Sequence, residues 1–189
     1  MALGQGKGTR TYLYISHGKI VMGTGNSKKY YTFIEGCIEG IYTKHSRFGD
    51  EDVVRWYIDI IDGEESYSLC FPYGSGVFKS VVLSLASLED FATDSSIRIQ
   101  PYEKKGYTKV VVYADGQKLN WVENCLPPQD IITIGEKQIK DDTKQMEYIS
   151  SLCAAIMERM KKNSIKQKKG NNKGSIENNY YICTKNKTV

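Results

Sequence analysis

The sequence predicts a mainly β protein: a small five-stranded β-barrel with one helix between its third and fourth strands, followed by an amphipathic helix. Short runs of β-branched and aromatic residues lie between residues 30 and 122, separated by turn-forming Gly, Asp and Pro. One segment, 76–88, instead spaces its apolar residues as a helix does. The barrel is expected to end at Pro127 and Pro128, since consecutive prolines suit neither a helix nor a central strand.

The first strand is expected at 31–42 and contains two glycines, Gly36 and Gly40. Glycine inside a strand marks a bulge, a bend or a close backbone approach. We therefore expect a strand that curls to serve both halves of the barrel. Alternation along it predicts one face made of Ile34, Gly36, Ile38, Gly40 and Tyr42.

The second strand, 53–61, shows the clearest alternation of apolar and polar residues. Trp56 belongs to its apolar face, and we therefore expect it in the core. An Asp-Gly pair at 62–63 predicts a tight hairpin turn into the third strand, 65–71.

The helix at 76–88 is expected to begin after Ser75, whose side chain suits the capping position. A fourth strand is expected at 96–100 and a fifth at 107–113. An Asp-Gly turn at 115–116 and a short last strand at 119–122 complete the barrel.

Beyond the prolines, a helix is expected to run to about Lys162, and Asp141 and Asp142 can cap it. Its apolar stripe must be buried, so we expect the helix to dock outside the barrel or to pair with another copy. The barrel is then expected to fold without it. The stripe consists of Met146, Ile149, Cys153, Ile156 and Met160.

These elements divide the chain into four parts. Residues 1–29 are a flexible basic N-terminal arm that can form a short hairpin, and residues 30–128 are the barrel. Residues 137–162 are the C-terminal helix, and residues 163–189 are a basic flexible tail.

The net charge of +4 is unevenly distributed along the chain. Residues 1–34 hold five basic and no acidic residues, residues 35–147 hold 12 basic and 20 acidic, and residues 148–189 hold nine basic and two acidic. Basic arms commonly contact phosphates, whereas an acidic centre does not attract nucleic acid in general. Five widely spaced cysteines without a CxxC pattern indicate reduced thiols and a cytoplasmic protein.

The order strand, strand, strand, helix, strand, strand, with a long first strand broken by glycine, is that of an OB-type β-barrel. Ligands of that fold lie across its second and third strands and between the loops joining strands one to two and four to five. Both loops here combine cations, which neutralise phosphates, with aromatic rings, on which bases stack. The candidate nucleic-acid-binding residues are Lys44, Arg47, Phe48, Arg55, Tyr57, Tyr102, Lys104, Lys105 and Tyr107.

On the stretches VVRWYIDIIDGEESYSLCFPYG and SIRIQPYEKKGYTKVVVYADG, the chain resembles the OB-fold single-stranded DNA-binding proteins, especially the phage type. The resemblance covers about residues 30–122 and implies coating of exposed single strands, with little sequence specificity, during replication or recombination. It places the protein in the host cytoplasm if a phage encodes it. The chain departs from the family because it ends in NKTV after a basic linker, whereas several members end in an acidic tail. A replication partner or a second copy is expected to bind through the C-terminal helix or tail.

Other classes of function stay open. His17 and His45 are the only histidines, and no catalytic, cofactor or zinc-binding pattern accompanies them, so we expect no catalysis, no cofactor and no metal. OB-type barrels also bind proteins, since a fold does not fix a function. A protein–protein adaptor, a structural protein and a single-stranded RNA binder are therefore the alternatives.

Overall fold

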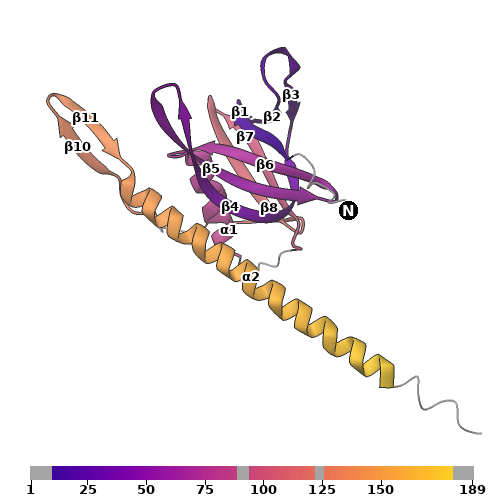
Figure 1. Ribbon diagram of the computed structural model, residues 1–189. Helices are drawn as coiled ribbons and strands as arrows, with labels where there is room; N and C mark the ends of the chain where they lie inside the picture. The colour runs from indigo at the N-terminus through magenta and orange to yellow at the C-terminus, as the bar shows by residue number, and fades with distance from the viewer. Residues whose placement is uncertain (1–9, 89–93, 122–125, 181–189) are drawn as a thin grey trace, which may run out of the picture.

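The computed structural model describes residues 10–88, 94–121 and 126–180; the expectations for residues 1–9 and 181–189 lie outside them. The body is a nine-stranded sheet in the order β3-β2-β1-β6-β5-β4-β7-β8-β9, and a separate two-stranded sheet projects from it (Figure 1). The large sheet consists of β1 (Thr11–Ser16), β2 (Lys19–Met22), β3 (Lys29–Tyr31), β4 (Ile34–Phe48), β5 (Glu51–Asp62), β6 (Glu65–Pro72), β7 (Ile97–Lys104), β8 (Tyr107–Ala114) and β9 (Gln117–Lys118). The other elements are β10 (Asp130–Ile134), β11 (Lys137–Asp141), a 3-10 turn at Gly25–Ser27, α1 (Gly76–Ala86) and α2 (Thr143–Tyr180).

The five strands predicted for the barrel lie side by side in the order β6-β5-β4-β7-β8, and α1 connects β6 to β7. The curled first strand is confirmed, because β4 pairs with both β5 and β7. A closed five-stranded barrel is not confirmed: β6 pairs on its outer edge with β1, and β8 pairs with β9. The protein is therefore mainly β, with a C-terminal helix, and its sheet stays open.

The bulge that the glycines of β4 predict lies between Ile38 and Gly40, where the pairing with β5 shifts register. The extra residue brings both Ile38 and Ile41 to the core, where they are 2% and 8% exposed. Tyr42 consequently turns to the outer face, so the prediction that it shares a face with Ile38 is wrong. At Gly36 the backbone passes so close to β5 that a Cβ atom would lie 2.4 Å from a carbonyl oxygen.

Both expected binding loops are two-residue turns. β4 and β5 stay paired up to the turn at 49–50, and β7 and β8 stay paired up to the turn at 105–106. The polar stretches 44–52 and 101–106, which we expect as loops, therefore belong mostly to strand ends. Backbone pairing at the tip of a hairpin requires no apolar side chains, so a polar stretch there can be part of a strand and not a loop.

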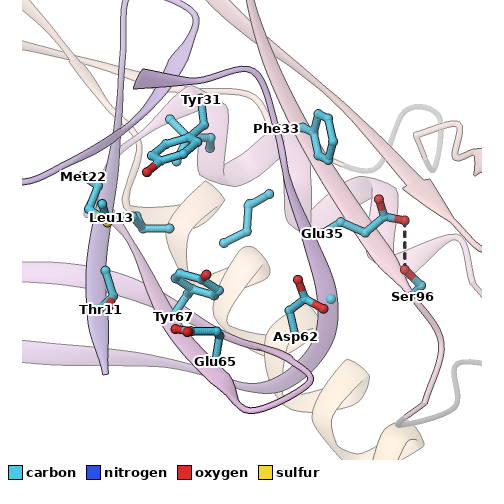
Figure 2. Close-up of a pocket in the computed structure, with 13 residues that line it drawn as sticks. Thr11, Leu13, Met22, Tyr31, Phe33, Glu35, Asp62, Glu65, Tyr67 and Ser96 are labelled. Carbon is cyan, nitrogen blue, oxygen red and sulfur yellow. Dashed lines mark hydrogen bonds between the residues drawn. The ribbon is translucent and has the colours of Figure 1, made fainter. Parts of the chain in front are cut away.

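Residues 11–29 are expected in the flexible arm, and residues 30–31 at the start of the barrel, but residues 11–31 instead contain three strands of the large sheet, β1, β2 and β3. The β1–β2 hairpin, which the sequence predicts, turns at His17 and Gly18, both with the positive φ of a type I′ turn. β1 pairs in parallel with β6, and the Gly18 backbone N–H donates to the Thr108 hydroxyl over 3.3 Å. The hairpin thus joins two parts of the sheet and borders a cavity of about 590 Å³ (Figure 2).

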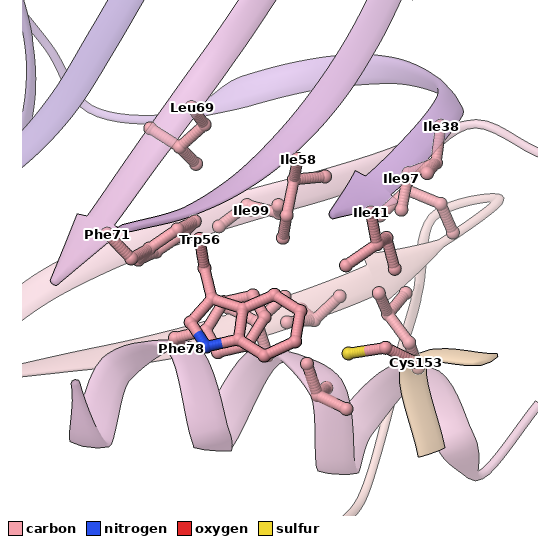
Figure 3. Close-up of a cluster of buried hydrophobic side chains, with 14 of the residues drawn as sticks. Ile38, Ile41, Trp56, Ile58, Leu69, Phe71, Phe78, Ile97, Ile99 and Cys153 are labelled. Atoms are coloured by element: carbon pink, nitrogen blue, oxygen red, sulfur yellow. The ribbon is translucent and has the colours of Figure 1, made fainter. Parts of the chain in front are cut away.

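The core lies between the sheet and the helices (Figure 3). Trp56 is 3% exposed and stacks on Phe78 of α1 with 4.7 Å between ring centroids, so its predicted core position is confirmed. The predicted cap of α1 is also confirmed, because the Ser75 hydroxyl accepts a hydrogen bond from the Phe78 backbone N–H.

Helix α2 begins at Thr143 and continues to Tyr180, whereas we expect a helix over 137–162 and a flexible segment after it. Residues 137–141 are a strand, and the polar segment beyond 162 contains no proline that would end a helix. The predicted apolar stripe is buried in the same cluster as the sheet core, against α1 and β4. Its members are Met146, Ile149, Cys153, Ile156 and Met160. No helix in the described part of the chain combines the length and apolarity needed to cross a membrane.

Candidate nucleic-acid interface

The outer face of β1, β4 and β5 carries three tyrosines around one lysine. Tyr42 and Tyr57 are cross-strand partners whose rings stack with 5.7 Å between centroids, and Tyr12 meets Tyr57 edge-on at 6.3 Å. The Lys44 ammonium nitrogen lies 5.2 Å from the Tyr57 centroid, 5.4 Å from that of Tyr42 and 5.7 Å from that of Tyr12. These distances allow cation–π attraction. We call these four residues the tyrosine–lysine cluster.

The surroundings of the cluster set the charge of two of its groups. Desolvation alone lowers the pKa of Lys44, but the hydroxyls of Tyr42 and Tyr12 outweigh it and raise the pKa above its ordinary value. Burial raises the pKa of the Tyr57 phenol, and the neighbouring Cys70 raises it further. The cluster therefore presents a charged ammonium beside a neutral Tyr57 ring at neutral pH.

Asp59 lies on the same face of β5 as Tyr57 and is only 4% exposed. Its carboxylate accepts hydrogen bonds from the Ser68 hydroxyl at 2.6 Å and the Tyr42 hydroxyl at 3.1 Å, and it forms an ion pair with Arg10. A buried carboxylate is tolerated when it is paired and hydrogen-bonded in this way. The network orients the Tyr42 ring and ties the start of β1 to β5.

Arg55 of β5 lies directly opposite Lys44 of β4. Like charges that face each other across a strand pair repel. Neither side chain forms an ion pair within the described residues, and the polar contact of Arg55 there is a long one, 3.9 Å to the Cys70 sulfur. Lys44 and Arg55 are therefore two adjacent cations with which no carboxylate pairs among the described residues.

A second group of tyrosines and lysines lies on the β7–β8 hairpin. Tyr102 is the cross-strand partner of Lys109, and Tyr107 is the partner of Lys104, so the two residue types alternate on one face. The rings are open to solvent, with Tyr107 71% and Tyr102 39% exposed. We call these four residues the hairpin cluster.

The structure brings the predicted residues into two groups. Lys44, Arg55 and Tyr57 share the outer face of β4 and β5, and the predicted residues of β7 and β8 share the hairpin, with Lys105 in its turn. Within the described residues, no hydrogen bond, ion pair or ring contact joins the two groups. Figure 1 shows the β4–β5 and β7–β8 hairpins pointing to the same side of the molecule.

Two predicted residues are not placed in either group. Arg47 lies opposite Asp52, and alternation along β4 puts it on the other face of the strand from Lys44. Phe48 ends β4, and its side chain lies outside the described part of the structure.

Sequence reasoning missed Tyr12, Tyr42 and Lys109. Lys109 could have been found, because pairing through the turn at 105–106 puts it on the face of Tyr102. Tyr42 depends on the exact position of the bulge, and Tyr12 depends on a parallel pairing between distant segments that carries no local sequence signal.

The fold and the site together define an open β-sheet protein with two groups of tyrosines and cations on its surface. The chain has no significant match to a family model, to a curated protein or to a solved structure. Among the residues that the structure describes, no three His, Cys, Asp or Glu side chains gather closely enough to hold a metal ion.

Proposed function

We propose that the protein binds single-stranded DNA without catalysis and with little sequence specificity, in replication or recombination. The observation that carries the proposal is the position of Lys44 directly opposite Arg55, beside stacked tyrosines and without a counter-charge within the described residues. A phosphate between these cations would relieve their repulsion and form charge-assisted hydrogen bonds with both.

The two groups are suited to different parts of a nucleotide. Tyr42 and Tyr57 already stack on each other and lie below the Lys44 ammonium, so this face offers charge rather than free rings. The exposed rings of Tyr102 and Tyr107 offer open faces for bases. The tyrosine–lysine cluster with Arg55 would then hold phosphates, and the hairpin cluster would stack bases.

The strand order supports the same proposal. The sequence β6-β5-β4-β7-β8, with α1 between β6 and β7, is the order of the five strands in an OB-type fold. The cations and rings lie on strands and not on a helix that could enter a major groove, which favours single strands over duplex.

The test compares fluorescence polarisation of labelled single-stranded DNA, single-stranded RNA and duplex DNA, each about 20 nucleotides long, at two salt concentrations. We expect the tightest binding to single-stranded DNA. The double variant Lys44→Gln with Arg55→Gln should weaken it and reduce the slope of log K against log salt by about 1.4, since each phosphate contributes about 0.7. Arg47→Gln, on the other face of β4, is the matched control. Equal or tighter binding to duplex would contradict the proposal.

A further inference from the structure

The cavity beside the N-terminal hairpin lies on the inner side of the sheet. Leu13 lines it, and alternation along β1 puts Leu13 on the opposite side from Tyr12 of the tyrosine–lysine cluster. Its volume of about 590 Å³ falls within the range of small-ligand pockets. The cavity is therefore a separate feature from the proposed nucleic-acid face.

Aromatic rings form much of the wall. Tyr31 and Phe33 are 42% and 43% exposed, and Tyr67 is half-buried below them (Figure 2). The guanidinium carbon of Arg98 lies 4.5 Å from the Phe33 centroid, so one ring at this wall already carries a cation. Tyr31 and Tyr67 supply the other two rings of the cavity wall.

The charge of the lining residues is wholly acidic. Glu35, Asp62 and Glu65 line the cavity, and among the residues that the structure describes no lysine or arginine does. Glu35 is neutralised by an ion pair of 2.7 Å with Arg98. Asp62 and Glu65 are exposed cross-strand partners, so their charges repel, and neither has an ion pair within the described residues.

Burial raises the pKa of Tyr67 in the cavity wall, and the carboxylates of Glu65 and Asp62 both raise it further. Figure 2 shows these two carboxylates on the same side of the cavity as the Tyr67 ring. A group that enters here meets two negative charges and two tyrosine rings.

We propose that this cavity binds an arginine side chain of a protein partner. A guanidinium stacks on aromatic faces and bonds carboxylates through its planar fork, and both kinds of group are present. It would also cancel the repulsion between Asp62 and Glu65. Phosphates are excluded by the same charges, so nucleic acid does not compete for this site. The cavity is larger than one side chain, and its apolar residues Leu13, Ile20 and Met22 suit an apolar neighbour of the arginine.

The probe is an acetylated, amidated peptide Gly-Leu-Arg-Leu-Gly, titrated into the full ¹⁵N-labelled chain at low salt. The same peptide with citrulline in place of arginine keeps the shape and removes the charge. We expect backbone amide shifts centred on Tyr31, Phe33 and Tyr67, and binding at least about fivefold weaker for citrulline, as two exposed ion pairs allow. Equal binding of the two peptides, or no shift at millimolar peptide, would overturn the proposal.

Variants of the chain locate the site. Asp62→Asn with Glu65→Gln should weaken the arginine peptide about fivefold, whereas Glu64→Gln, one residue away in the same turn and outside the cavity lining, should not. An equal loss with Glu64→Gln would show general attraction to an acidic turn and contradict the proposal. Binding of single-stranded DNA should be the same in all three proteins, so failure here leaves the nucleic-acid proposal separately testable. The comparison of arginine with citrulline needs no variant and stands if a variant misfolds.

Discussion

The ammonium nitrogen of Lys79 in α1 lies 2.7 Å from a carboxylate oxygen of Asp142, the residue before α2. The Lys79 side chain is only 8% exposed and also donates to the Gln145 side-chain oxygen at 3.0 Å. An isolated ammonium at such a site would be costly, so this pair fixes the start of α2 against α1.

Asp142→Ala should lower the free energy of unfolding by about 2–4 kcal/mol, because it leaves the buried Lys79 charge with Gln145 alone. Asp130→Ala is the matched control, since the pair of Asp130 with Lys144 is exposed at both side chains and should contribute about 0–1 kcal/mol. Urea unfolding followed by circular dichroism measures both. Equal losses would show that the Lys79 pair does not fix the helix.

Ile149→Ala should lower the free energy of unfolding by about 2–5 kcal/mol, because the side chain is fully buried and the change leaves a cavity between α2 and the body. Ser150→Ala, on the exposed side of the same turn, is the control and should change little.

The burial of the α2 stripe also predicts that removing residues 137–189 abolishes cooperative unfolding, in contrast to the expectation from the sequence. A truncated chain that unfolds cooperatively would contradict this prediction.

Tyr107→Ala and Tyr102→Ala should each weaken binding of single-stranded DNA by about 1–3 kcal/mol, because each removes one stacked base, with little change in salt slope. The corresponding changes to Phe keep the ring and should retain most of the affinity. Tyr30→Ala is the control, since Tyr30 is 62% exposed on β3 and belongs to neither cluster. Polarisation titrations at two salt concentrations separate stacking from charge. A similar loss for Tyr30→Ala would contradict the assignment.

Cys153 should resist thiol reagents in the native protein. Burial raises the pKa of its thiol from 9.0 to about 12, so the reactive thiolate is scarce at pH 8. Cys70 is half-buried and should react before Cys153, as mass spectrometry after brief alkylation will show. In the unfolded chain Cys153 ionises near its ordinary pKa, so unfolding releases a proton above about pH 9. Stability should therefore fall as pH rises from 9 towards 12. Faster alkylation of Cys153 than of Cys70 would show that α2 opens readily.

The elements that the sequence predicts correctly are those with local signals. The alternation of β5 identifies its core face, Ser75 identifies the start of α1, and the stripe of α2 identifies every buried residue of that helix that the structure describes. The β10–β11 hairpin is absent from the sequence prediction although its turn begins with Gly135 at positive φ, a usable signal.

The parts that could not be predicted depend on distant residues. β1 pairs with the outer edge of β6, and no periodicity in residues 11–16 predicts this pairing. The tyrosine–lysine cluster joins residues from β1, β4 and β5, so only Lys44 and Tyr57 of its members could be found in advance, together with the neighbouring Arg55.

The parallel pairing of β1 with β6 has a consequence for synthesis on the ribosome. Arg10 and Ser66, which are hydrogen-bonded in the folded protein, are 56 residues apart. The β1–β2–β3 segment is therefore made long before its partner strand, and an isolated small β-meander is only marginally stable in water. Its pairing edge must wait until residues 65–72 have emerged, and contacts of such separation form slowly. A nascent chain paused before that point would carry its first strands without their permanent neighbour, which makes that stage the one most open to chaperones or to pairing with another chain.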